Sequence, residues 1–228
     1  MQLFVGLSSH RGSIKRFGFD LLEMPVSSSL PKVKTLRELR AQRPNLKFSL
    51  RVHPDSLQVG ADHPDIAKTA AAADALNAAV IVLATGPRFS PIRRNIETLR
   101  KIVAELSAEG REIAWEPRGV WAPEESEKLA AELGVLLVRD LTREAAPALA
   151  TTIYTRLLPF GTGARVSQNS IETLAQHLEV ADVAYVVVQG DGAKMTRSQL
   201  KNWFDELDEE FDDSSEDELI ESSTEEES

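Results

Sequence analysis

Short apolar runs and helical stretches alternate along most of this chain, and the alternation limits the folds open to it. Runs of strand length rich in Val, Ile and Leu predict strands that are covered on both faces, as in parallel sheets. Parallel neighbours are usually joined by a right-handed crossover through a helix. We count eight such runs, at 3–8, 20–26, 47–53, 79–85, 112–118, 135–140, 152–158 and 184–190.

Between these runs the sequence predicts helices at 31–43, 63–79, 90–110, 122–134, 170–181 and 196–207. In the third of them Ser90 is the expected N-cap, Pro91 the first helical residue and Gly110 the residue after the end, while Gly134 ends the fourth. The segments after the first and sixth strands lack clear helical periodicity. The pattern predicts an α/β fold, a compact TIM-type (β/α)₈ barrel in a single domain. Seven strands with an irregular segment, or a doubly wound sheet, are the alternatives.

Charge divides the chain into two unequal parts. The net charge is −10, but residues 205–228 hold 14 Asp and Glu and no Lys or Arg, so the remaining 204 residues carry 26 basic and 22 acidic groups. A run of like charges with few apolar residues repels itself and cannot build a core. We therefore expect a barrel domain over 1–204 and a disordered acidic tail over 205–228, which offers a contact for a protein partner.

Composition excludes several classes of site and location. The chain has no Cys, so disulfides, thiolate nucleophiles and zinc–thiolate sites are excluded. No apolar run reaches the roughly 20 residues that cross a bilayer, and the N-terminus does not resemble a signal peptide. We therefore expect a cytoplasmic protein without a membrane partner. No motif for DNA readout is present, so nucleic acid is not an expected partner.

The stretch IAWEPRGVW (113–121) ends an apolar run on a carboxylate and a guanidinium. Side chains in a barrel strand alternate between the interior and the helix layer, and active sites lie at the carboxyl ends of the strands. Ile113 and Trp115 should then face the helices. Glu116 and Arg118 should face the mouth of the barrel.

The same alternation places other polar side chains at this mouth. They are Ser8, Glu23, Arg51, His53, Asp140, Arg156 and Gln189. Arginine forks match carboxylate and phosphate groups, so the set predicts a site for a small polar or anionic molecule that is sugar- or phosphate-like. Glu116 and Glu23 are the candidate acid and base catalysts, and the other residues are candidate substrate ligands. A purely structural network of ion pairs is the alternative.

Metal and cofactor sites have little support in the sequence. The four His residues, at positions 10, 53, 63 and 177, include no pair at helical spacing, and we predict no metal site. The sequence identifies no cofactor.

The motifs FDLLEM, FSLRVHP, VLATGPRF, AWEPRGVW, LGVLLVRD and IYTRLL together resemble the "domain of unknown function 72" family, the YecE-like proteins. The resemblance spans most of residues 1–204 and implies a TIM-type barrel. Its most specific part is the Glu-x-Arg strand end with a following Trp, here Glu116, Arg118 and Trp121. The resemblance also matches Glu23 and Arg156, and places Arg51 where a Lys is common.

The chain departs from the family pattern at the rim of the expected site. The strand-two Glu is followed by Pro25 and later by Ser28 and Ser29, where the family has Asn and an aromatic pair. The first loop lacks the usual Trp, and Ala84 and Leu158 replace a Gln and a His. The resemblance therefore implies a divergent member, in which the ligand has changed or the ancestral activity has been lost. We expect a hydrolase, lyase or isomerase, with a non-catalytic binding or interaction protein as the alternative.

Deletion of residues 205–228 tests the domain division. Because this segment should bury no apolar surface, the shortened chain should melt within about 2 °C of the full chain in a calorimetric scan. A drop of 10 °C would show that the tail is part of the folded domain.

Overall fold

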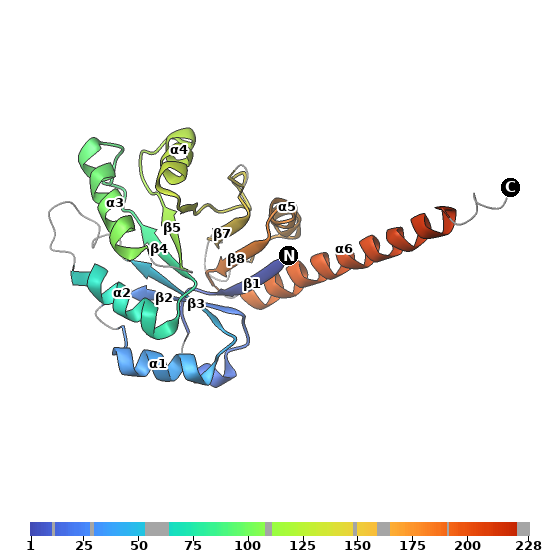
Figure 1. The fold of residues 1–228 in the computed structure, drawn as a ribbon, viewed down its shortest axis with the longest axis horizontal. Coiled ribbons are helices and arrows are strands. Elements are labelled where there is room, and N and C mark those ends of the chain that lie inside the picture. Colours follow the sequence, from blue (N-terminus) through green and yellow to red (C-terminus); the bar gives the residue numbers. More distant parts are fainter. Residues whose placement is uncertain are drawn as a thin grey trace.

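The computed structural model contains eight strands in one parallel sheet, with helices packed around them (Figure 1). It describes residues 1–10, 12–27, 30–52, 64–107, 111–147, 150–158, 165–190 and 192–222, and of residues 64, 65 and 208–222 it describes the backbone alone. The elements are β1 (Gln2–Leu7), η1 (Ile14–Arg16), β2 (Leu21–Val26), α1 (Val33–Gln42), β3 (Lys47–Val52), α2 (Pro64–Leu76), β4 (Val80–Ala84), α3 (Arg93–Leu106), β5 (Glu112–Glu116), α4 (Pro123–Leu133), β6 (Leu136–Leu137), β7 (Thr152–Leu157), α5 (Gln168–Leu178), β8 (Val183–Val188) and α6 (Ala193–Ser222).

The strand order β6-β5-β4-β3-β2-β1-β8-β7 is that of a barrel in which β6 and β7 meet to close the ring. All pairs are parallel, and β1 pairs with both β2 and β8. The structure therefore confirms the predicted TIM-type α/β barrel and its eight strands. The doubly wound sheet is excluded, because that fold leaves its sheet open.

The closing seam between β6 and β7 is narrow. Among the described residues, a single bridge joins them, from Arg139 to Thr155. The buried hydroxyl of Thr155 reinforces it by donating to the Arg139 carbonyl at 2.8 Å and accepting from the Leu141 amide at 3.3 Å. Strand β6 has only two residues, but it pairs with β5, so the barrel has eight strands and the alternative of seven strands with an irregular segment is excluded.

Two apolar clusters pack against the sheet, one on its outer face and one on its inner face. The outer cluster, between strands and helices, includes Ile113 and Trp115. The inner cluster fills the barrel interior with Leu21, Val80, Val82, Ala114, Val138, Tyr154, Tyr185 and Val187. The predicted alternation of β5 is thus confirmed, since Ala114 lies inside while its neighbours in sequence lie outside.

Helix boundaries follow the sequence signals in part. Gly134 ends α4 in the left-handed conformation at φ 62°, as its position predicts. The predicted start of α3 at Ser90 and Pro91 was wrong, because the helix begins at Arg93 after Ile92. Residues 86–92 form consecutive turns instead, in which the Ser90 carbonyl accepts from the Ile92 amide at 2.8 Å.

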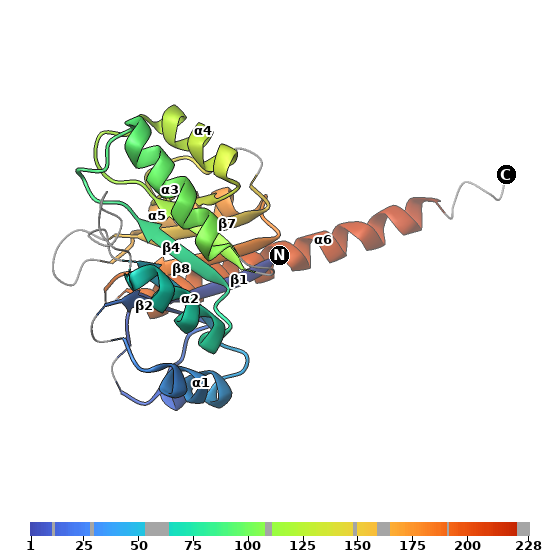
Figure 2. The same ribbon diagram turned by 60° about the vertical axis from the view of Figure 1, so that its left-hand side comes forward.

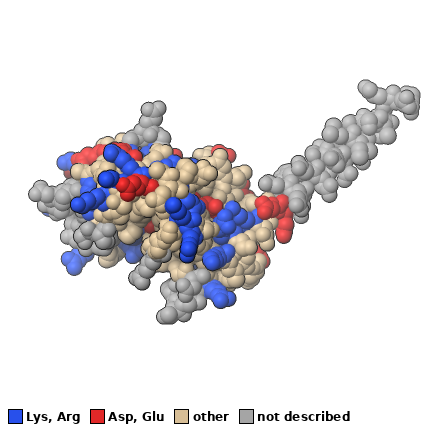
Figure 3. Space-filling view, turned by 90° about the horizontal axis from the view of Figure 1, so that it is seen from below, with Lys and Arg blue, Asp and Glu red and all other residues tan. Residues whose placement is uncertain are grey.

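The acidic C-terminal segment adds no strand to the barrel within its described residues, which end at residue 222. Helix α6 packs against β1 and α5, with Leu200 fully buried, and then leaves the barrel body (Figure 2). The helix extends beyond its predicted end at residue 207, while the predicted division into a barrel and a disordered tail stays a prediction. In Figure 3, basic and acidic side chains are interspersed on the face of the barrel that is seen. No helix in the described ranges is long and apolar enough to cross a membrane.

Replacement of Thr155 by Val tests the closing seam. The change keeps the shape of the side chain but removes the hydroxyl from a fully buried position, which leaves the Leu141 amide without that partner. We expect the free energy of unfolding to fall by about 1–3 kcal/mol in urea denaturation. Thr98→Val removes a hydroxyl from the exposed face of α3, where it donates to Arg94, and should cost at most about 0.5 kcal/mol. Equal losses in both variants would contradict the proposed role of Thr155.

Candidate functional site

Glu116, the last residue of β5, is held between two guanidinium groups. Its Oε2 accepts from Nε of Arg51 at 2.9 Å and from NH2 of Arg51 at 2.8 Å. Its Oε1 accepts from Nε and NH2 of Arg118 at 3.1 and 2.8 Å. The Glu116 side chain is 9% exposed, whereas that of Arg118 is 44% exposed. The ion pairs thus run from the barrel wall toward solvent.

Glu23 on β2 forms a second group with two residues of β7. Its Oε1 accepts from Nε and NH2 of Arg156, both at 3.1 Å. Its Oε2 accepts from the Tyr154 hydroxyl at 2.9 Å, and that hydroxyl lies 2.9 Å from Oγ of Ser49. Because the Tyr154 hydroxyl uses its one hydrogen to donate to Glu23, Ser49 must be the donor in the hydrogen bond between Ser49 and Tyr154. Glu23 is therefore bound directly to β7 and is connected to β3 through the Tyr154 hydroxyl.

The strand register explains why the two groups lie at different depths. Glu23 pairs in register with Ser49, two residues before Arg51 on β3. Arg51 pairs with Val82, two residues before the partner of Glu116 on β4. Glu23 is consequently deeper in the barrel than predicted, with a side chain that is 1% exposed.

The pKa values of the Glu23 and Glu116 carboxyl groups are shifted in opposite directions. Burial raises the pKa of the Glu23 carboxyl above its usual 4.5, and the charges of Arg156 and Arg51 offset only part of that effect. Burial alone would also raise the pKa of the Glu116 carboxyl. The charges of Arg51, Arg156 and Arg118 outweigh it there, so this pKa lies below 4.5. Opposite shifts of two neighbouring carboxyl groups are typical of acid and base pairs in enzymes.

The loop after Glu116 is fixed against the loop that follows β4. Gly119 has a φ of 101°, and a Cβ there would lie 2.6 Å from the Pro87 carbonyl oxygen, so a side chain cannot fit. Trp121 donates from Nε1 to the Phe89 carbonyl at 2.6 Å and packs edge-on against Trp115 at 4.9 Å between ring centres. These contacts orient Arg118, which the same loop carries.

Three predicted site residues lie outside this cluster, and they are Ser8, Asp140 and Gln189. Asp140 is turned into its own loop, where its carboxylate accepts from the hydroxyl of Thr142 at 2.6 Å and from the Leu158 amide at 3.3 Å. Ser8 lies just after β1 and is half-buried, and Gln189 lies after β8 and is exposed. No hydrogen bond in the described part of the chain joins either to the cluster. His53 lies outside the described residues.

Tyr154 and Ser49 complete the cluster although the sequence did not assign them to the site. The available signal was their period-two spacing with Arg156 and Arg51, which puts both side chains on the inner face of their strands. Burial holds the pKa of the Tyr154 hydroxyl well above 10, so it remains a hydrogen-bond donor to Glu23. Within the described ranges, no three His, Asp or Glu side chains lie close enough to hold a metal ion.

Comparison with known proteins finds similar structures but no similar sequence. No protein-family model matches the chain, and no curated protein matches it. Among solved structures, a DUF72 family protein from Thermotoga maritima has a TM-score of 0.71 at 15% identity, covering 90% of this chain and 100% of that one. A DUF72 family protein from Enterococcus faecalis has a TM-score of 0.71 at 14% identity, covering 88% and 94%.

A sugar epimerase has a less similar barrel. D-psicose 3-epimerase from Clostridium cellulolyticum, solved with D-tagatose, has a TM-score of 0.56 at 15% identity, with 83% of this chain and 82% of that one covered. These similarities confirm the fold that the family resemblance implies. At such identities they carry the fold alone.

Substitution of each carboxyl group by an amide tests the opposite pKa shifts. Glu116→Gln leaves Arg51 and Arg118 without their anion, and should lower the free energy of unfolding at pH 7 by about 3 kcal/mol. Because the folded-state pKa of Glu116 is lowered, its contribution is complete above 4.5 and is lost as the pH falls through the folded-state value. The difference between wild type and Glu116→Gln in urea denaturation should therefore shrink below pH 4.5.

Glu23→Gln provides the contrast in the same measurements. The raised pKa of Glu23 means that its ionisation in the folded state costs stability. Its contribution is fully present below 4.5 and is lost as the pH rises through the raised value. With rising pH, the free energy of unfolding of wild type should therefore fall relative to that of Glu23→Gln. Parallel pH dependences for the two variants would contradict the assignment.

Proposed function

We propose that this protein is an enzyme of the barrel class that acts on a small polar substrate, sugar-like or anionic, at the mouth of the barrel. The observation that carries the proposal is the charged cluster itself. It combines two carboxyl groups of opposite pKa shift with three guanidinium groups, on strands whose carboxyl ends form the active-site face of TIM barrels. A hydrolase, lyase or isomerase reaction fits such a pair of proton-transfer groups.

The cluster carries an excess of positive charge. When both carboxyl groups are ionised, the three arginines leave one net positive charge, and protonation of Glu23 leaves two. Each guanidinium group has five N–H donors, and a fork to one carboxylate uses two of them. The remaining donors can bind a carboxylate, a phosphate or several hydroxyl groups. Arg118 is the most exposed of the three and is the best placed to meet a substrate first.

The pKa directions suggest separate roles for the two carboxyl groups. Glu116 stays ionised and is the candidate base, whereas Glu23 retains a proton more readily and is the candidate acid. Tyr154 is a positioning residue, since its hydroxyl fixes Oε2 of Glu23 at 2.9 Å. The fold similarity to the DUF72 family proteins and to D-psicose 3-epimerase supports membership of the DUF72 family and a sugar-like substrate by analogy alone.

A non-catalytic binding protein is the second candidate, and one observation favours it. Both carboxylates already accept hydrogen bonds from arginine forks, so the cluster satisfies itself without a ligand. A ligand would then bind to the outer guanidinium surface and leave unchanged. The two candidates share the site and differ in whether the ligand is converted.

A thermal-shift screen with sugars, sugar phosphates and hydroxy acids tests the site. A ligand at 100 times its dissociation constant adds about 2.7 kcal/mol to the stability, which raises Tm by about 5 °C or more in a domain of this size. We expect at least one compound to stabilise wild type and fail to stabilise Glu116→Gln. Glu97→Gln is the matched control, because it removes an exposed partner of Arg93 on α3.

Two results would count against the proposal. If no stabilising compound depends on Glu116, the site assignment is wrong. If a dependent compound is found, its incubation with wild type and Glu23→Gln, followed by NMR, separates the two candidates. Conversion by wild type that falls at least 100-fold in Glu23→Gln supports the enzyme, and a compound that wild type leaves intact supports the binding protein.

A further inference from the structure

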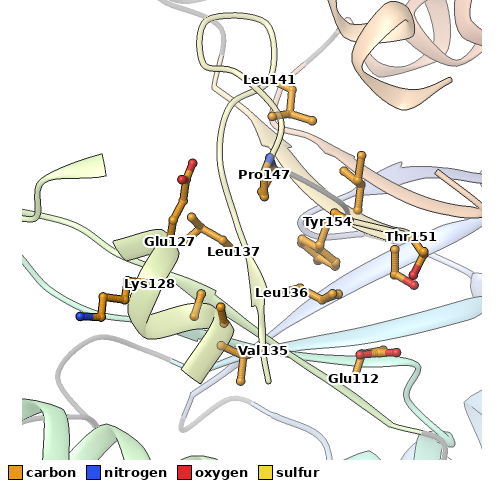
Figure 4. Close-up of a pocket in the computed structure, with 15 residues that line it drawn as sticks. Glu112, Glu127, Lys128, Val135, Leu136, Leu137, Leu141, Pro147, Thr151 and Tyr154 are labelled. Atoms are coloured by element: carbon orange, nitrogen blue, oxygen red, sulfur yellow. The ribbon is translucent and has the colours of Figure 1, made fainter. Parts of the chain in front are cut away.

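A cavity opens through the side of the barrel, away from the charged mouth. It has a volume of about 540 Å³ and lies between α4, β6 and β7 (Figure 4). The connection from β6 to β7 contains no helix in its described residues, so the helix layer is interrupted there. The seam beside it is bridged only at Arg139 and Thr155 in the described part of the chain. The cavity therefore occupies the position of a missing outer helix.

The walls of the cavity are mainly apolar and come from both sides of the barrel wall. Leu137 and Ile153 belong to the outer apolar cluster, whereas Leu136 and Tyr154 belong to the inner one. A cavity lined by both pairs must pass between the strands. The remaining apolar lining residues are Ala130, Ala131, Val135, Leu141, Pro147 and Ala150.

Polar groups lie at the edge of this lining. In Figure 4, Glu112 and Thr151 lie on one side of the apolar residues, with their oxygen atoms visible. Glu127, on α4, is paired with Arg139 at 2.7 Å, and Lys128 points away from the centre. Acceptor oxygens thus border the cavity at one edge, and no strong charge of either sign lies in its middle.

We propose that this cavity binds a small, neutral, mostly apolar molecule, with a hydroxyl or N–H group directed toward Glu112 and Thr151. Its volume lies within the roughly 300–1,000 Å³ of typical small-molecule sites. Burial of an apolar ligand gains about 25 cal/mol for each Å² removed from water, and a single donor on the ligand can hydrogen-bond to one of the acceptor oxygens at the edge. Leu141 and Pro147, from the connection between β6 and β7, also line the cavity, so an occupant must fit between this connection and α4, which suits a small molecule.

The occupant would also touch the machinery at the mouth. The Tyr154 ring lines the cavity, while its hydroxyl donates to Glu23. The site is nevertheless independent of the proposed function, because apolar burial and the Glu112 edge suffice for binding. A failure at the mouth would leave this proposal intact.

Binding of N-phenyl-1-naphthylamine tests the cavity. This probe is neutral, largely apolar and carries one N–H group, and its fluorescence rises on leaving water. We expect saturable binding of one probe per full-length chain. Ala131→Phe fills the cavity from the exposed side of α4 and should weaken binding at least tenfold. Ala71→Phe makes the same change at an exposed position of α2 outside the cavity lining and should leave binding unchanged.

A second filling variant guards against misfolding of the first. Ala150→Leu fills the cavity from the β7 side, and the circular dichroism melting curve of each variant reports whether it folds. Weaker binding in a folded variant of either kind, with unchanged binding in Ala71→Phe, supports the proposal. Absence of saturable binding to wild type would overturn it, as would affinity equal to that of wild type in every filling variant that folds.

Discussion

The need to pair buried charges determines the structure of the barrel near the carboxyl ends of its strands. An ionised group that leaves water loses several kcal/mol of hydration unless partners replace it. The carboxylates of Glu23 and Glu116 meet this cost with arginine forks from β3, β7 and the loop after β5. Each partner lies on a different strand or loop from the next, so the network holds β2, β3, β5 and β7 at fixed distances. Below it, the inner apolar cluster fills the barrel.

The network is asymmetric, and the asymmetry gives it chemical character. Glu23 is enclosed and accepts from Tyr154, whereas Glu116 lies nearer to solvent beside Arg118. The different balance of burial and positive charge separates the pKa values of two otherwise identical groups.

Local rules predicted much of the fold and part of the site. The period-two alternation of β5 correctly placed Trp115 outside and Ala114 inside, because both faces of a barrel strand are packed. Where the element is short the rule fails. Strand β6 has two residues, so alternation does not reach Asp140, and its carboxylate turns back to Thr142. Ser90 and Pro91 looked like a helix start, yet the turns of the loop moved that start to Arg93.

The partners of Glu23 could not be predicted from local rules at all. Tyr154 and Arg156 lie on β7, and their meeting with β2 depends on how the closed barrel staggers its strands. The sequence indicated that these side chains share the interior, which is weaker than contact. The side cavity also has no local signal, because it arises from the absence of a helix between β6 and β7 and from the spacing of those strands.

The seam at Thr155, between β6 and β7, is the weakest of the strand interfaces in the described part of the barrel. Seven of the strand interfaces are continuous ladders, and the eighth is a single bridge. A ring of this kind can change its circumference at one joint while every other joint keeps its register. Tyr154 lies on β7, beside this seam, and its hydroxyl reaches across the interior to Glu23 on β2, so a wider seam would shift that hydrogen bond first. A change in the diameter of the barrel would therefore also change the position of the Glu23 carboxyl group inside it.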